Sequence, residues 1–290
     1  MSDPRMKPHD AASLLVLRDS PAGPEVYMVR RHPSSRFMAN ALVFVGGRID
    51  AADGAPEMLE RCSGLAPEEA ARRLGMAPGE GAEAAGLHVA AIRECLEECG
   101  LLLADRVDDE PLSDAERDEL RAELLDGRVS FAGLCQRRRL RLPLADLRFI
   151  ARWVTPEEET RRFDARFFAC RAPGGQTASV DPREATLGVW LSADEALRAN
   201  RERRELLAPP TLTILERLRR FSTVAELLSA TPREVTVTQP RVLPGAVPLT
   251  LLLPGDHRFQ DLASPEGPEH YVVLEAGHWR RVCASFPDDG

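Results

Sequence analysis

The chain has 290 residues, 43% of them hydrophobic and 29% charged, with a formal net charge of −8. This composition excludes a wholly disordered chain, and the acidic balance argues against a dedicated nucleic-acid binder, whose footprint would be basic. The sequence has no run of 18 apolar residues and its first ten residues are polar, so we expect no membrane segment and a cytoplasmic location.

The N-terminal part of the chain predicts the start of a mixed β-sheet. Residues 12–17 and 25–30 are apolar runs joined by a turn rich in Pro and Gly, which is typical of a hairpin. A further strand at 41–45 leads into Gly46 and Gly47. Because glycine has no side chain, the backbone there can approach a ligand closely.

A helical insertion is predicted after this glycine pair. Residues 51–85 are rich in Ala, Glu, Gly and Pro, with short helices expected at 58–62 and 67–74. A longer helix then covers 87–99 and stops at Gly100, a typical residue after a helix end.

The rest of the chain alternates between strands and helices. A short strand is expected at 101–103, and Ser113 with Glu116 has the capping-box spacing that begins a further helical segment at 113–127. We then expect strands at 149–155, 166–170 and 187–191, helices at 192–199, 211–221 and 224–228, and a β-rich tail over 234–286. This alternation predicts an α/β (or α+β) fold.

Three glutamates on the helix at 87–99 suggest a site for a divalent cation. Glu94, Glu97 and Glu98 are three or four residues apart, so their carboxylates project from one helix face. Clustered carboxylates attract Mg²⁺ or Mn²⁺, hard cations that prefer oxygen ligands and bind substrate phosphates. Arg93 precedes Glu97 by four residues and can orient it. A solvated acidic surface is the alternative interpretation.

The six cysteines contain no CxxC pair, so we expect them to be reduced. Cys95 and Cys99 share a helix face, which leaves two interpretations open, a metal site or small buried side chains.

The segment Arg93-Glu-Cys-Leu-Glu-Glu-Cys-Gly-Leu101 resembles the second half of the Nudix box, the signature of the Nudix hydrolase superfamily. The resemblance implies a Nudix fold, with a mixed β-sheet sandwiched between helices. In the first half of the box, position 85 is Ala where the family has Glu. In the stretch Phe44-Val-Gly-Gly47, Val45 replaces the usual Pro. The insertion at 51–85 splits the box.

A split box is typical of the peroxisomal-type coenzyme A diphosphatase branch and its bacterial relatives. Residues 40–50, Asn-Ala-Leu-Val-Phe-Val-Gly-Gly-Arg-Ile-Asp, resemble the stretch that precedes the box in that branch. Arg31 and Arg36 keep the spacing of its coenzyme A signature. Three later segments are also similar, Ala-Arg-Trp-Val-Thr-Pro at 151–156, Arg-Phe-Asp-Ala-Arg-Phe-Phe at 162–168 and Leu-Ala-Pro-Pro-Thr at 207–211.

The resemblance assigns roles to residues of this chain. It implies that Glu94, Glu97, Glu98 and the carbonyl of Gly47 hold the metal, and that Arg93 takes part in catalysis. The general base would be Glu97, with Glu184 on a later loop as the second choice. For the substrate, Arg31 and Arg36 would contact phosphates, while Arg162 and Phe163 would shape the substrate loop. An ordinary surface charge is the alternative for the first two, and a core position is the alternative for Phe163.

The implied function is hydrolysis of coenzyme A or acyl-CoA to adenosine 3′,5′-bisphosphate and a phosphopantetheine product. The alternatives are a pyrophosphatase for ADP-ribose or another nucleoside diphosphate derivative, and a Nudix-fold binding or regulatory module that is catalytically weak. We expect a Nudix hydrolase domain at 10–215 and an extension at 216–290. For the tail, a homodimer interface, a lid and a pocket wall are all open.

Overall fold

The computed structural model describes residues 7–35, 38–106, 112–181, 185–230, 234–262, 264 and 267–283. Its centre is a mixed sheet in which β1 (His9–Ser20) and β9 (Phe163–Arg171) pair in parallel. The strand order is β11-β3-β2-β1-β9-β8-β12, and β10 and β4 add to β2 and β1. The other strands are β2 (Gly23–Arg31), β3 (Ala41–Val43), β4 (Val45–Arg48), β8 (Arg148–Val154), β10 (Ala185–Ser192), β11 (Leu206–Leu207) and β12 (Val237–Thr238).

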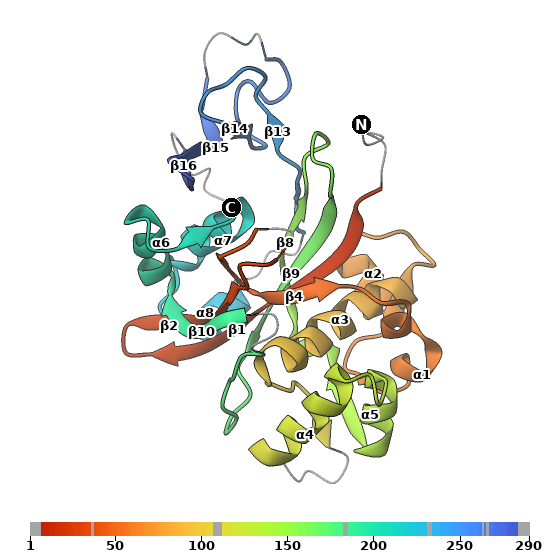
Figure 1. Cartoon of the computed structure of the whole chain (residues 1–290). Coiled ribbons are helices and arrows are strands. Elements are labelled where there is room, and N and C mark those ends of the chain that lie inside the picture. The colour runs from red at the N-terminus through yellow and green to blue at the C-terminus, as the bar shows by residue number, and fades with distance from the viewer. Residues whose placement is uncertain are drawn as a thin grey trace.

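Two helical layers cover the sheet. Side chains alternate along β1, so Leu14 belongs to one core cluster and Leu15 to the other. The helix α3 (Gly81–Cys99) covers the first face, and α6 (Ala193–Arg201), α7 (Pro209–Leu218) and α8 (Val224–Ser229) cover the second (Figure 1). The predicted α/β fold with a sheet between helices is confirmed.

The helical material between β4 and β8 packs beside α3 (Figure 1). The predicted helix at 67–74 is present as α2, whereas the one predicted at 58–62 begins earlier and ends before Cys62, which enters a strand. The elements here are η1 (Ala51–Gly54), α1 (Pro56–Leu59), β5 (Cys62–Ser63), α2 (Pro67–Arg73), β6 (Asp105–Arg106), α4 (Asp114–Leu125), α5 (Phe131–Arg137), β7 (Leu140–Pro143) and η2 (Leu144–Asp146).

The helix that carries the three glutamates is longer than predicted, since α3 begins at Gly81 and not near residue 87. Gly86 lies inside this helix, at the point where η1 packs closely against it. A Cβ at this position would come within 3.0 Å of the backbone nitrogen of Gly54. This glycine therefore marks a close contact between two elements and not a break in the helix.

The strand predicted at 101–103 is wrong. These three leucines are buried but form no strand in the described structure. The side-chain amide of Gln176 takes the place of a partner strand, since it accepts from the nitrogen of Leu102 at 2.9 Å and donates to its oxygen at 3.0 Å. One distant glutamine thus satisfies a buried backbone that the sequence pattern assigns to a sheet.

The β-rich tail folds into a small sheet of its own, formed by β13 (Arg241–Val242), β14 (Thr250–Leu252), β15 (His270–Glu275) and β16 (His278–Cys283). Its last strand lies against α6 and α7. The Trp279 side chain joins the second core cluster, and its carbonyl oxygen accepts from Asn200 Nδ2 at 2.9 Å. The Arg281–Glu216 ion pair at 2.8 Å adds a second link to α7.

Across the described part of the chain, no helix is long and apolar enough to cross a membrane.

His88 is a buried titratable group on the sheet-facing side of α3. Its Nδ1 lies 2.8 Å from the carbonyl oxygen of Ala84, and its ring lies 4.5 Å from that of Phe168. Burial lowers the pKa of His88 from 6.5 to about 4, against the opposing effect of the Ala84 hydrogen bond. The neutral ring therefore stabilises the fold fully above pH 6.5, and this contribution is lost as the pH falls toward 4.

A comparison with His88→Leu tests this. Between about pH 7 and pH 4, we expect the wild type to lose about 3 kcal/mol more unfolding free energy than the variant, because only the wild type must protonate a buried imidazole. Urea denaturation at both pH values measures the difference. Parallel losses in the two proteins would contradict the assignment.

Candidate active site

The three glutamates lie on the last turns of α3, beside β4. A Cβ added to Gly47 would overlap the Glu94 carboxylate, so the missing side chain leaves the space that this carboxylate occupies. The nitrogen of Gly46 donates to Glu98 Oε2 at 2.8 Å. The structure therefore brings the glycine pair and the acidic end of α3 together.

Arg93 lies among the acidic side chains. Its Nη1 donates to Glu94 Oε1 at 2.9 Å and to Glu97 Oε2 at 3.0 Å, and its Nη2 donates to the oxygen of Arg48 at 3.0 Å. Burial alone would lower the pKa of Arg93, but the hydrogen bonds and charges of its acidic neighbours, Asp53 first among them, raise it above the ordinary value. The guanidinium is therefore a permanent cation that orients two of the glutamates.

Asp53 completes the site and was not predicted from the sequence. Its carboxylate accepts from Arg93 Nε at 2.9 Å and from Nη2 at 3.0 Å, and its side chain is 2% exposed. An acid near the start of the predicted insertion therefore reaches the box arginine, whereas position 85, where the family has its upstream Glu, is a buried Ala. The available signal was the position of Asp53, six residues after Gly47 and near the start of the predicted insertion.

The donor set suits a hard divalent cation. Glu94 and Glu97 are 13% and 20% exposed, so their carboxylates can reach a ligand at the surface. Within the described ranges, no group of three or more His, Cys, Asp or Glu side chains is arranged to hold a metal. Glu94 and Glu97 instead share Arg93 Nη1. Glu94, Glu97 and Glu98, with the carbonyl of Gly47, are the groups that would hold such a cation.

The predicted substrate residues lie elsewhere on the sheet. Arg31 is at the end of β2, opposite Ala185 of β10, while Phe163 pairs with His9 at the start of β9. On β1, His9 is three residues, or about 10 Å, from Ala12, the partner of Gly47.

Arg162 and Phe163 differ in burial. Arg162 is buried, with Nε donating to the oxygen of Thr155 at 3.3 Å, whereas Phe163 is half-buried beneath the guanidinium of Arg161 at 5.3 Å. Phe163 is therefore less buried than the core position considered as its alternative. Two further predicted residues, Arg36 and Glu184, lie outside the described residues.

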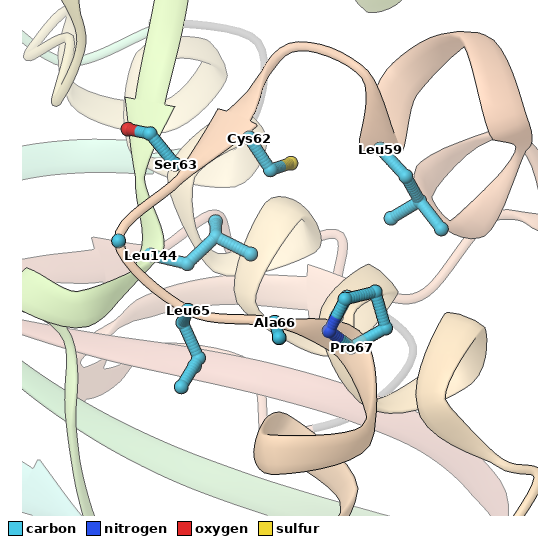
Figure 2. Close-up of a pocket in the computed structure, with 9 residues that line it drawn as sticks. Leu59, Cys62, Ser63, Leu65, Ala66, Pro67 and Leu144 are labelled. Atoms are coloured by element: carbon cyan, nitrogen blue, oxygen red, sulfur yellow. The ribbon is translucent and has the colours of Figure 1, made fainter.

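A cavity of about 410 Å³ lies in the helical insertion (Figure 2), and none of the three glutamates lines it. Leu59, Leu65 and Leu144 line it, together with Ala85. Ala85 and Glu94 are nine residues apart, which at 3.6 residues per turn places them on about opposite sides of the helix. The cavity therefore belongs to the packing of the helical insertion.

Cys95 and Cys99 face the sheet and are fully buried, with their sulfur atoms 3.5 Å apart. Burial raises the pKa of Cys95 well above its usual value. The interpretation as small buried side chains is confirmed, and the described cysteines are all free thiols.

The sequence of this chain is similar to known Nudix proteins. Residues 11–218 match the NUDT19 Nudix domain model. The acyl-coenzyme A diphosphatase NUDT19 of Gallus gallus is 30% identical over 300 residues, covering 87% of this chain and 76% of that protein. The human protein of the same name is 27% identical, covering 91% and 82%. The Xenopus laevis protein is 28% identical, covering 70% of this chain but only 62% of its own length, which is less than two thirds.

A solved structure supports the same assignment. A NUDIX hydrolase from Alicyclobacillus acidocaldarius superposes with a TM-score of 0.66 at 27% identity, covering 78% of this chain and 98% of that one. The predicted Nudix fold is thereby confirmed. Because the family model matches more than half of the chain, this protein belongs to the NUDT19 Nudix domain family and is a Nudix hydrolase.

Proposed function

We propose that this Nudix hydrolase cleaves the diphosphate of coenzyme A or acyl-CoA, giving adenosine 3′,5′-bisphosphate and phosphopantetheine or its acyl form. The main observation is the acidic end of α3, where Glu94 and Glu98 lie against Gly47 and Gly46. Relatives named acyl-coenzyme A diphosphatase support the choice of substrate.

Mg²⁺ or Mn²⁺ is the proposed cofactor, held by Glu94, Glu97, Glu98 and the carbonyl of Gly47. When bound, such an ion neutralises phosphate oxygens and stabilises the charge of an in-line displacement. Glu97 accepts a proton from the attacking water, a new phosphorus–oxygen bond forms, and the bridging oxygen leaves with the other phosphate. Arg93 fixes the direction of the Glu97 carboxylate through Nη1.

The remaining predicted residues act on the substrate in this proposal. Arg31 and Arg36 contact phosphates of the adenosine half, because guanidinium groups bind phosphate in a bidentate way. Arg162 and Phe163 shape the substrate loop. Glu184 is the second choice for the general base. Asp181, three residues earlier in the chain, donates its backbone N–H to the oxygen of Glu98 at 3.2 Å.

A substrate panel tests the proposal. We expect the purified protein with Mg²⁺ to hydrolyse CoA or acyl-CoA at least tenfold faster than ADP-ribose, with adenosine 3′,5′-bisphosphate identified by mass spectrometry. Faster hydrolysis of ADP-ribose would favour the alternative pyrophosphatase. Hydrolysis of no CoA species would exclude the proposed substrate.

The remaining expectations from the sequence stay predictions. The substrate is a small nucleotide-type molecule, and we propose neither a nucleic-acid nor a membrane partner. A cytoplasmic location and a homodimer also belong to the proposal, and the native mass of the protein tests the second. The alternative of a catalytically weak binding module is disfavoured, because Asp53 supplies a buried acid for Arg93 although position 85 is Ala.

A further inference from the structure

The last turn of α3 carries Glu97 and Glu98 and ends in backbone carbonyls that need donors from outside the helix. Two of them accept from one segment after β9. The nitrogen of Ser179 donates to the oxygen of Cys99 at 2.9 Å, and the nitrogen of Asp181 donates to the oxygen of Glu98 at 3.2 Å. The helix end is therefore bonded to a loop from a distant part of the sequence.

Arg121 of α4 supplies the next donor. Its Nε donates to the oxygen of Glu97 at 2.8 Å. Its Nη1 donates to Ser179 at two atoms, the backbone oxygen at 3.1 Å and Oγ at 3.0 Å. The side chain is 8% exposed. One rigid guanidinium thus joins the backbone of the proposed general base to the loop that bonds the next two residues of the helix.

The charge of Arg121 also acts at this helix end. The C-terminus of a helix carries partial negative charge, so carboxylates on the last turn are destabilised there. A buried cation beside the carbonyl of Glu97 offsets this repulsion. Gly100 makes room for it, since its φ is 67° and a Cβ there would lie 3.3 Å from Arg121 Nη1.

We propose that Arg121 is a positioning residue for metal binding. It contacts the helix backbone and fixes where the carboxylates of Glu97 and Glu98 stand. The inference rests on the proposed role of these two glutamates as metal ligands. It also gives the helix α4 a part in the active site, which the box motif alone does not indicate.

Mn²⁺ binding without substrate tests the inference, measured by electron paramagnetic resonance of the free ion. We expect Arg121→Met to weaken Mn²⁺ binding by about tenfold or more, the usual effect of losing a group that orients metal ligands. Arg117→Met is the matched control. Arg117 is also buried on α4, but it bonds the oxygen of Leu112 at 2.9 Å and Asp114, so its loss should leave Mn²⁺ affinity within about twofold of wild type.

The outcomes separate the inference from the proposed function. If the wild type binds Mn²⁺ but hydrolyses no CoA species, the proposed substrate is wrong. The role of Arg121 is then still decided by the Mn²⁺ affinities of the variants. Wild type that binds no Mn²⁺ would overturn the metal site itself. Folded Arg121→Met with wild-type Mn²⁺ affinity, or an equal loss in Arg117→Met, would overturn the positioning role.

A second variant covers failure of Arg121→Met to fold. Arg121→Lys keeps the charge, but a single ammonium cannot reproduce the fork that joins the Glu97 carbonyl to Ser179. We expect about threefold weaker Mn²⁺ binding, between wild type and Arg121→Met. Wild-type affinity in folded Arg121→Lys would then overturn the inference.

Discussion

Replacing Glu97 with Gln is expected to lower kcat by about 10³-fold while leaving the protein folded. Glutamine has nearly the same shape, and it keeps an oxygen that can accept from Arg93 Nη1, which lies 3.0 Å from Glu97 Oε2. What it loses is the negative charge and the ability to accept a proton. Because the side chain is 20% exposed, we expect the free energy of unfolding to change by less than about 1 kcal/mol.

Steady-state kinetics with saturating Mg²⁺, together with urea denaturation, measure both effects. Glu83→Gln is the matched control, because Glu83 is an exposed glutamate near the start of the same helix. It removes the same charge far from Gly47 and should leave kcat unchanged. If Glu97→Gln retained activity, Glu97 would not be the general base, and Glu184 would be the next candidate for that role.

The acidic end of α3 could be predicted because its geometry is local. Three-and-four spacing places Glu94, Glu97 and Glu98 on neighbouring positions in any α-helix, and Gly100 marks its end. The capping box at Ser113 and Glu116 is also local, and it begins α4 as predicted. A pattern within one helical turn can be predicted because the geometry of the helix alone fixes where its residues lie.

Contacts between distant segments could not be predicted in this way. The bond between Asp53 and Arg93 spans 40 residues, and that between Arg121 and Ser179 spans 58. The strand expected at 101–103 failed for the same reason, since the Gln176 side chain that replaces its partner strand is 74 residues away. Apolar periodicity identifies a buried segment but does not say which group will bond its backbone.

The helix α5 was also missed. Its seven residues include Gly133, which lowers helix propensity, and its cap at Ser130 lacks the acidic partner that completes a capping box. Its burial comes from packing of Phe131 and Leu134 in the first core cluster. Tertiary contacts therefore stabilise a helix that the local sequence does not predict.

Asp53→Asn is expected to destabilise the fold by about 3 kcal/mol, the largest effect on stability that we expect from a single change at the site. Both Asp53 oxygens accept from the guanidinium of Arg93, and Oδ2 also accepts from the nitrogen of Asp50 at 2.8 Å. Asparagine removes the charge and turns an NH₂ group toward a donor. Arg93, at 7% exposure, would then keep a buried charge with part of its neutralisation lost.

Asp50→Asn is the matched control, since Asp50 lies 3.8 Å from the same guanidinium with 70% of its side chain exposed. A surface pair contributes at most about 1 kcal/mol, so this variant should unfold close to wild type. Urea denaturation of both variants, with unchanged slopes, compares them on one scale. Equal stability of the two would mean that the buried contact adds nothing.

A larger loss in Asp53→Asn would indicate that the insertion divides the Nudix box in sequence while its acid and arginine remain one structural unit. Because Arg93 also holds Glu94 and Glu97, the same variant should weaken Mn²⁺ binding as the guanidinium draws more strongly on these two carboxylates.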